Sequence, residues 1–240
     1  MKQIKNWIWQ DNLNVVSTND DAKSLVAKLK QPCIVSALEQ TGGRGRRGNS
    51  WVSQKGNLFA SFAFEIKANE LCHMVILSAV AVLKTISHFI KDAKIEVKWP
   101  NDVLVNGEKI SGILFEKADD NFWVMGVGIN IVSNPELVDI KYNATSLHNL
   151  GIYTDRLSVL EHLTNVLDKL LEHYQTSGFS QIKQTWLDNA YNLGNAVLIK
   201  QEKQTIDGIF LTIDDNGAMV LKTNEEIKKI LVGDLFVKES

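Results

Sequence analysis

Apolar residues in the amino-terminal part of the chain recur first at helical spacing and then in short strand-like runs. Thr18 and Asp21 resemble a capping box and precede a helically spaced apolar set, which predicts a helix over about 19–30. The segments 33–38 and 58–66 are rich in β-branched, aromatic and small apolar residues, and they predict two buried strands. A loop with four glycines lies between these strands.

The middle of the chain continues with one long apolar run and several shorter ones. The run 71–90 is apolar on most sides and predicts a largely buried helix. The segment 102–116 places Asn106 and Gly107 between two apolar runs, which is typical of a hairpin with a type I′ turn. Two further strands are predicted over 95–99 and 122–131.

The last part of the chain changes from helical to strand-like spacing. Leucines at helical spacing predict a helix over about 157–174 that stops near Gly178, and a short helix follows over 182–191. Beyond it, turn residues separate five predicted strands: 197–200, 206–213, 218–222, 229–232 and 235–238. We therefore expect an α+β domain of residues 1–191 with a largely antiparallel mixed sheet, and a small all-β domain of residues 192–240. A unit as small as the second must pack on the first.

Composition excludes several classes of protein. The 240 residues are 45% hydrophobic and 22% charged, which are globular values and exclude disordered and collagenous chains. The 26 basic residues nearly balance the 28 acidic ones. The chain therefore has no broad positive charge that would attract DNA or an anionic membrane surface. The chain itself shows no signal peptide, and its longest apolar stretch, 74–83, is far shorter than a membrane span. We expect a cytoplasmic protein.

The cysteines and histidines indicate no metal or disulfide framework. Cys33 and Cys72 belong to no CxxC pair, which fits a reducing compartment. The five histidines form no HxH or HExxH spacing, so we do not expect a metalloenzyme built on histidine ligands.

The most informative motif is the segment 40–51, QTGGRGRRGNSW, which we call the arginine loop. Glycines let backbone amides approach an anion, and guanidinium groups bind carboxylate or phosphate in a bidentate manner. Three close arginines repel one another, so a polyanionic ligand would order the loop as a lid. A solvated turn with chance charges is the alternative. Gly43, Gly45 and Gly48 also match a dinucleotide fingerprint, but no helical apolar period follows, so we reject that interpretation.

A second motif, KWPNDVLVNGEKISGIL, covers 98–114. A turn at Asn106 and Gly107 would place Leu104 opposite Lys109 and Asp102 opposite Ser111. Lys109 would then lie diagonally beside Asp102, with Cβ atoms roughly 7 Å apart. This pair is either an ordinary surface ion pair or part of a site. Gly112 within the strand indicates a close approach of a ligand or another backbone.

Together with GVGIN at 126–130, these two motifs resemble the biotin protein ligase family, in a form without the amino-terminal DNA-binding domain. The resemblance runs from Ser17 to the carboxyl end. It implies the catalytic fold of biotin and lipoate ligases followed by a small Src-homology-3-like barrel. It also implies an ATP-dependent, AMP-forming reaction: biotin and ATP give biotinyl-5′-AMP, and biotin then passes to a lysine of the biotin carboxyl carrier protein of acetyl-CoA carboxylase.

The resemblance assigns residues to each ligand. Biotin would be bound by Ser17, Thr18, Gln40, Gly43, Arg44, Arg46, Lys109, Gly112 and Gly128. The nucleotide would be bound by Arg47, Trp51, Lys98, Asn101 and Asn130. Asp102 would help hold Mg²⁺, and the catalytic residues would be Arg46, Lys109 and Lys98. The biotin carboxylate is already ionised, so cations rather than a base suit this chemistry.

Two residues depart from the family pattern, and several alternatives stay open. Asp20 stands where the family usually has Gln, and Asn49 stands where the loop often carries a basic residue. A lipoate ligase shares the fold but typically lacks the arginine loop, and a non-catalytic regulator that binds biotin or nucleotide is a further alternative. We expect that the protein binds neither a specific DNA sequence nor a membrane, and that it is a monomer or a weak homodimer.

Overall fold

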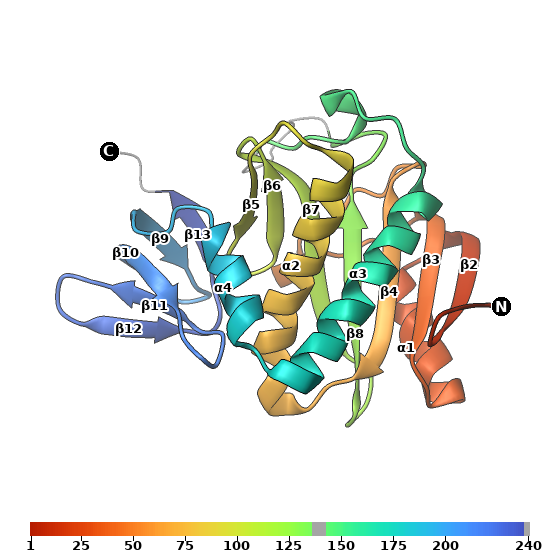
Figure 1. The fold of residues 1–240 in the computed structure, drawn as a ribbon, viewed down its shortest axis with the longest axis horizontal. Coiled ribbons are helices and arrows are strands. Elements are labelled where there is room, and N and C mark those ends of the chain that lie inside the picture. The colour runs from red at the N-terminus through yellow and green to blue at the C-terminus, as the bar shows by residue number, and fades with distance from the viewer. Residues whose placement is uncertain (136–142, 238–240) are drawn as a thin grey trace.

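A large mixed sheet forms the main body of the protein in the computed structural model, which describes residues 1–135 and 143–237 (Figure 1). Its strands, in spatial order, are β1 (Lys2–Ile4), β2 (Trp7–Val15), β3 (Cys33–Gln40), β4 (Leu58–Glu65), β8 (Phe122–Ile129), β7 (Glu108–Lys117), β6 (Asp102–Val105) and β5 (Ile95–Lys98). Strands β2 and β3 are parallel, and the other neighbours in this sheet are antiparallel. The predicted α+β class with a largely antiparallel mixed sheet is confirmed.

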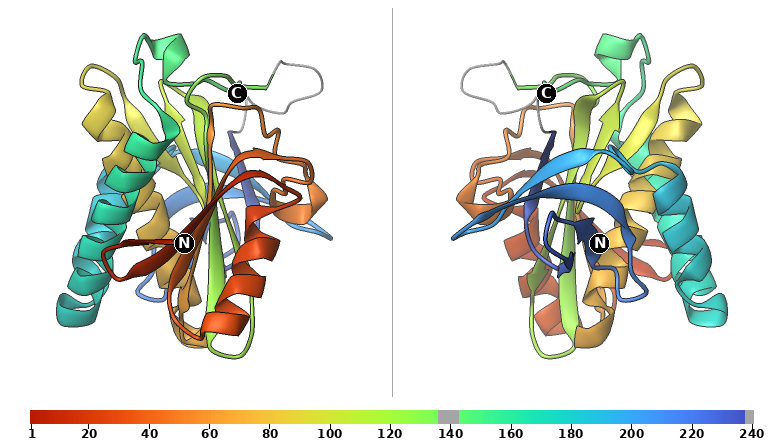
Figure 2. Two further views of the ribbon diagram at one scale, coloured as in Figure 1. Left: turned by 90° about the vertical axis from the view of Figure 1, so that its right-hand side faces the viewer. Right: turned by 90° about the vertical axis from the view of Figure 1, so that its left-hand side faces the viewer.

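Helices cover both faces of this sheet (Figure 2). Helix α1 (Thr18–Leu29) lies on one face, where Ala22 and Val26 pack against buried residues of β3, β4 and β8. Helices α2 (Leu71–Phe89) and α3 (Arg156–Ser177) lie on the opposite face and enclose the larger apolar core. The predicted helices are confirmed to within a few residues, because their apolar stripes are buried against the sheet and against one another.

Helix α2 is the most apolar element of the chain. By length and composition alone, the helical segment Ala68–Phe89 could cross a membrane, with a mean hydropathy of 1.6. The sequence expectation missed this property because it counted only the uninterrupted stretch 74–83. Most of the apolar side chains of α2 are buried inside the protein against the sheet and α3, and this burial accounts for its composition.

The carboxyl-terminal part of the chain forms a separate sheet, which Figure 1 shows in blue beside the large one. Its order is β12 (Ile227–Ile230), β11 (Met219–Lys222), β10 (Thr205–Ile213), β9 (Ala196–Lys200) and β13 (Asp234–Val237), and every pair is antiparallel. Helix α4 (Ser180–Asp188) joins the sheets, since buried Trp186 meets buried Phe210 with ring centroids 6.2 Å apart. We call this five-stranded unit the barrel. Four of the five predicted strands are confirmed to within one residue, with residue 238 outside the described part of the chain. The prediction of 229–232 was two residues late, since β12 is Ile227–Ile230, and the boundary at 191 and 192 stays a prediction.

Three local expectations were wrong or incomplete. Strands β1 and β2 were not predicted, although β2 carries two buried tryptophans, Trp7 and Trp9. The capping box at Thr18 and Asp21 is absent: Ser17 is the N-cap, without a side-chain cap bond. The Thr18 hydroxyl instead donates to Gln40 Oε1 at 3.0 Å. The cap pattern was therefore a by-product of residues that serve a tertiary contact.

Candidate active site

A cavity of about 860 Å³ opens at the junction of the large sheet, the arginine loop and the barrel. Most of the predicted site residues line it: Ser17, Thr18, Gln40, Arg44, Arg46, Trp51, Lys98, Asn101, Asp102, Lys109, Gly112, Gly128 and Asn130. Gly43 and Arg47 do not line it. Segments that are far apart in the sequence thus converge on one hollow.

One end of the cavity is polar and is built by α1 and β3. The Oε1 atom of Gln40 accepts hydrogen bonds from both the backbone nitrogen and the hydroxyl of Thr18, at 2.8 and 3.0 Å. The Nε2 atom of Gln40 donates to Ser53 Oγ at 3.1 Å, which fixes the orientation of the amide. Gly43 lies behind this group, because a Cβ there would be 2.5 Å from Ser53 Oγ. Buried and half-buried amide and hydroxyl groups in this arrangement suit a ligand with both donors and acceptors.

Gly112 on β7 and Gly128 on β8 are paired opposite one another and form the floor of the cavity. The Trp51 ring lies directly on them: a Cβ at Gly128 would be 2.4 Å from Trp51 Cε2, and one at Gly112 would be 2.9 Å from Cζ3. Only glycine permits this approach, as the sequence predicted for Gly112. The buried Trp51 Nε1 has no hydrogen-bond partner within the described structure.

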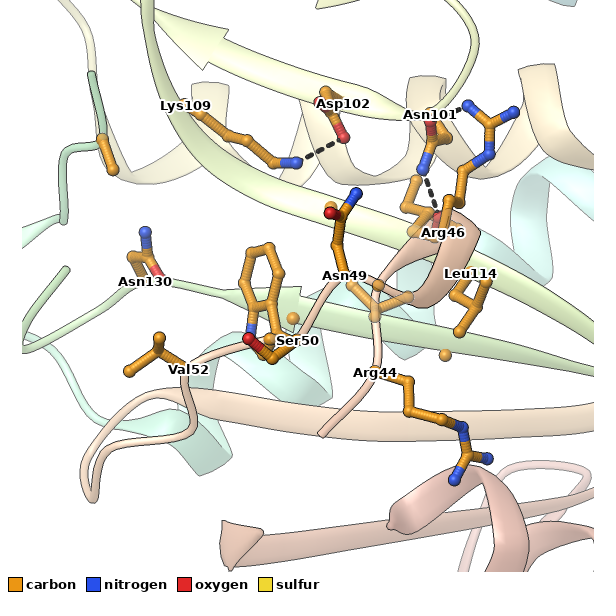
Figure 3. Close-up of a pocket in the computed structure, with 18 of the residues that line it drawn as sticks. Arg44, Arg46, Asn49, Ser50, Val52, Asn101, Asp102, Lys109, Leu114 and Asn130 are labelled. Atoms are coloured by element: carbon orange, nitrogen blue, oxygen red, sulfur yellow. Dashed lines mark hydrogen bonds and ion pairs between the residues drawn. The ribbon is translucent and has the colours of Figure 1, made fainter. Parts of the chain in front are cut away.

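The hairpin of β6 and β7 brings an amine and a carboxylate together on the cavity wall. Asn106 and Gly107 have φ angles of 51° and 84°, and Lys109 Nζ lies 2.8 Å from Asp102 Oδ1 (Figure 3). The predicted turn and the predicted pair are therefore confirmed. The register was wrong beyond Leu104, because an irregularity there places Asp102 opposite Gly112 rather than Ser111.

The arginine loop is tied to the barrel by two guanidinium groups. Arg46 Nη1 lies 3.0 Å from Asp234 Oδ1, and Arg47 Nη1 lies 2.9 Å from Asp234 Oδ2. Arg46 also donates to Asn101 Oδ1, and Arg47 to the carbonyl of Lys200. The loop contains only a 3₁₀ turn over 46–48 and no α-helix, which agrees with rejecting the dinucleotide fingerprint.

Arg44 points away from the cavity, toward α1 (Figure 3). Its guanidinium makes a bidentate pair with Asp20, at 2.7 and 2.8 Å, and a further contact of 3.1 Å with Glu116. Hydrogen bonding from Arg44 lowers the pKa of Asp20 below its ordinary value. Asp20, the departure from the family pattern, therefore anchors the base of the arginine loop.

A chain of hydrogen bonds, which we call the polar relay, connects this anchor with the polar end of the cavity. Glu116 accepts from Asn19 Nδ2 at 2.7 Å, and Asn19 Oδ1 lies 2.6 Å from Ser61 Oγ. Ser61 Oγ lies 2.8 Å from the hydroxyl of Thr18. The Ser61 proton goes to Asn19, so the single Thr18 hydroxyl proton is shared between Ser61 and Gln40, while the Thr18 backbone nitrogen also donates to Gln40. Burial raises the pKa of Glu116, but the bonds from Asn19 and Arg44 hold it below its ordinary value, so the relay begins at a charged carboxylate.

The side of the cavity beside the barrel carries two cationic side chains, Lys98 and Arg46. Lys98 is 6% exposed, and burial together with the neighbouring charge of Lys109 lowers its pKa to about 8. Burial also lowers the pKa of Arg46, despite the nearby carboxylates. Lys98 Nζ lies 5.6 Å from the centroid of the Phe236 ring, so the barrel covers this side. One buried and two half-buried cations, Lys98, Arg46 and Lys109, line the cavity with two carboxylates, and this balance suits an anionic ligand.

Three lining residues of the barrel, Asp234, Leu235 and Phe236, were missed by sequence reasoning. They are separated from the arginine loop by most of the chain, and no local pattern marks them. Asn130, in contrast, was predicted and is 2% exposed, with Nδ2 donating to the carbonyl of Thr145 at 3.0 Å. The ligand roles of all these residues stay predictions.

Comparison with known proteins identifies relatives over nearly the whole chain. Residues 13–130 match the Biotin/lipoate A/B protein ligase family, and residues 193–238 match the Biotin protein ligase C terminal domain. The bifunctional ligase/repressor BirA of Bacillus subtilis is 37% identical over 84% of this chain, which spans only 65% of the length of that relative. The biotin–[acetyl-CoA-carboxylase] ligase of Paracoccus denitrificans is 31% identical over 86% of this chain and 90% of its own.

Solved structures agree with these relatives. The biotin protein ligase from Aquifex aeolicus in complex with biotin and ATP is 28% identical, with a TM-score of 0.80 over 99% of this chain and 100% of that one. Since sequence and structure relatives coincide in both the large sheet and the barrel, the chain belongs to the biotin protein ligase family.

Proposed function

We propose that this chain activates biotin with ATP to biotinyl-5′-AMP and transfers biotin to a lysine of a biotin carboxyl carrier protein. The observation that carries the proposal is one cavity that joins a polar end, a glycine floor and the three cationic side chains Arg46, Lys98 and Lys109. The complexes of Aquifex aeolicus ligase with biotin and ATP support the same ligands. The family match at 193–238 favours biotin over lipoate, because it is a biotin ligase domain.

In the first half-reaction, a carboxylate oxygen of biotin attacks the α-phosphorus of ATP. The bond from that phosphorus to the bridging oxygen breaks, and pyrophosphate leaves with the electron pair. Two anions must approach one another, so the main task of the protein is charge neutralisation and alignment. We assign this task to Arg46, Lys98 and Lys109, the cationic side chains that face the cavity.

We assign the ureido ring of biotin to the polar end, where Ser17, Thr18 and Gln40 lie. Gly43 and Arg44 would approach biotin through their backbone, in keeping with the outward Arg44 side chain. Gly112 and Gly128 would line the pocket, where they let the Trp51 ring lie against the sheet, and Trp51 would pack over the ligand. Asn130, Asn101 and Arg47 would face the nucleotide.

Asp102 fits a role in holding Mg²⁺. Magnesium is usually held by one or two carboxylates together with substrate phosphates, and the Asp102 carboxylate lines the cavity beside the cations. Within the described residues, no group of three or more His, Cys, Asp or Glu side chains forms a complete metal cage. The ion would neutralise phosphate charge.

In the second half-reaction, a lysine amine of the carrier attacks the acyl carbon of the adenylate. The bond from that carbon to the phosphate oxygen breaks, AMP leaves, and the nitrogen loses a proton to form the amide. The name of the Paracoccus relative supports a carboxylase carrier as the acceptor. The cytoplasmic location and the monomeric or weakly dimeric state stay predictions.

The test combines a pyrophosphate-release assay with mass spectrometry of the product. Biotin and ATP should release pyrophosphate, and a carrier domain should gain one biotinyl group on one lysine. Lipoate in place of biotin should give neither signal. Binding of biotin and ATP without pyrophosphate release would instead indicate a non-catalytic regulator.

A further inference from the structure

Asp234 of strand β13 is the one residue through which the barrel makes the described ion pairs to the arginine loop. Its two carboxylate oxygens are divided between the two arginines, with Oδ1 facing Arg46 and Oδ2 facing Arg47. A phosphate group presents the same feature: neighbouring oxygens on one centre, each able to accept from a different guanidinium.

The charges of the cavity do not balance in this state. Apart from Arg44, which points outward, the charged side chains that line it are Arg46, Lys98, Lys109, Asp102 and Asp234. Asp102 pairs with Lys109 and also lies near Lys98, while Asp234 pairs with Arg46 and with Arg47, which does not line the cavity. One carboxylate thus stands among several cations that a polyphosphate would neutralise more completely.

The backbone of the loop also indicates a state held by this ion pair. Arg47 has a φ of 52°, in the left-handed region that a residue with a side chain rarely adopts. In this conformation its guanidinium reaches Asp234 and the carbonyl of Lys200. Release of Asp234 would remove one of the contacts that accompany this conformation of Arg47.

We propose that Asp234 is a placeholder for a phosphate group: its carboxylate holds Arg46 and Arg47 in the free protein and yields them when a nucleoside triphosphate enters. The inference rests on the proposed function. A carboxylate and a phosphate cannot share the same two guanidiniums without like-charge repulsion, so the ion pairs must break as the nucleotide binds. Asp234 therefore competes with the nucleotide and sets its affinity.

The test measures nucleotide affinity in a charge variant. Asp234→Asn keeps the shape and one acceptor oxygen but removes the negative charge. The probe is adenosine 5′-(α,β-methylene)triphosphate with Mg²⁺, titrated by calorimetry into biotin-saturated protein so that no adenylate forms. We expect the variant to bind the probe about fivefold more tightly, the scale of removing one like charge near a solvated anion.

Asp215→Asn is the matched control, because it removes one carboxylate from the same barrel, where Asp215 pairs with Lys183 and does not line the cavity. The affinity of the Asp215→Asn protein for the probe should equal that of the wild type. Equal or weaker binding by Asp234→Asn overturns the inference. The titration is repeated without Mg²⁺. If Asp234→Asn binds the probe more weakly than the wild type only when Mg²⁺ is present, the inference is also overturned, and Asp234 is a metal ligand instead.

A crystal structure of the unaltered protein with biotin and the probe gives a second test that does not depend on the variant folding. Both guanidiniums should lie on phosphate oxygens and outside hydrogen-bonding distance of Asp234. Retention of the present contacts of 3.0 and 2.9 Å would refute the placeholder. Failure of the wild type to bind the probe at all would refute the proposed function, and the inference with it.

Discussion

Lys109 Nζ lies 2.8 Å from Asp102 Oδ1 although the two residues are not directly opposite one another in the hairpin. The irregularity at Leu104 shifts the register by one residue and places Asp102 opposite Gly112. The long lysine side chain spans the diagonal, so its ammonium group is held at a defined point of the cavity wall rather than in solvent.

We expect Lys109→Ala to slow adenylate formation by about 10²-fold or more, because a preorganised cation beside the reacting phosphate would be lost. Single-turnover kinetics with radiolabelled ATP measure this step directly. Lys117→Ala on the same strand is the control, since Lys117 pairs with the fully exposed Asp120 and should keep the normal rate. A folded Lys109→Ala protein with a normal rate would remove Lys109 from the catalytic residues.

Gly128→Ala should weaken biotin binding by about tenfold or more, since the new Cβ would lie 2.4 Å from Trp51 Cε2 and overpacking costs about 1–3 kcal/mol. Calorimetry with biotin measures the affinity, and thermal unfolding measures the stability. Adding Trp51→Ala should restore the stability of the glycine variant without restoring biotin affinity. If the double variant stays as unstable as Gly128→Ala, the Trp51 contact is not the source of the strain.

Nucleotide binding should weaken as pH rises through about 8, the pKa of Lys98 in the folded protein. Below this pH Lys98 is charged and attracts phosphate, and above it the charge is lost. The same lowered pKa gives the opposite sign for stability: burial of the charged amine costs free energy at low pH, and this cost is relieved as pH rises above about 8.

Calorimetric titration of the α,β-methylene nucleotide between about pH 7 and 9.5 checks this dependence. Lys98→Arg should remove the change near pH 8, because a guanidinium stays protonated throughout this range. A wild-type affinity that is flat across the range, or an arginine variant that retains the same midpoint, would contradict the assignment to Lys98.

Asp20→Ala should raise the KM for biotin several-fold, because Arg44 would lose its bidentate partner and the base of the arginine loop would lose its anchor. The unfolding free energy should fall by less than about 1 kcal/mol, as expected for a pair near the surface. Steady-state kinetics and chemical denaturation provide the two measurements. Asp120→Ala, a change at a fully exposed carboxylate, should alter neither. A large loss of stability with an unchanged KM would make Asp20 a structural residue only.

Much of the fold was predictable because its elements carry strong local patterns. Helix α2 and strand β4 are nearly continuous apolar segments, and Asn106 with Gly107 carries a turn preference in two residues. Strand β2 was missed because polar residues follow Trp7 and Trp9, and its side chains become exposed toward the sheet edge. Its parallel pairing with β3 depends on tertiary contacts and cannot be predicted from the local spacing of apolar residues.

The site was predictable where its residues lie in dense motifs and not where tertiary contacts complete it. The arginine loop and the 98–114 motif contain most of the lining residues. Asp234 meets Arg46 across 188 positions of sequence, and nothing near Asp234 marks it as a partner. The role of Asp20 was also hidden, because only the folded loop brings Arg44 to it.

The polar relay connects the Thr18 end of the cavity with the anchor of the arginine loop, so ligand binding at one place can change the free energy of ordering at the other. Thr18 stands at one end of it and the Arg44 anchor at the other, so a ligand that tightens the Thr18 end favours the anchored form of the loop. Linkage is reciprocal: if biotin binding stabilises the ordered loop by some free energy, then ordering of the loop strengthens biotin binding by the same free energy. Under the proposed function, biotin binding at the polar end and the anchored form of the arginine loop would therefore stabilise one another.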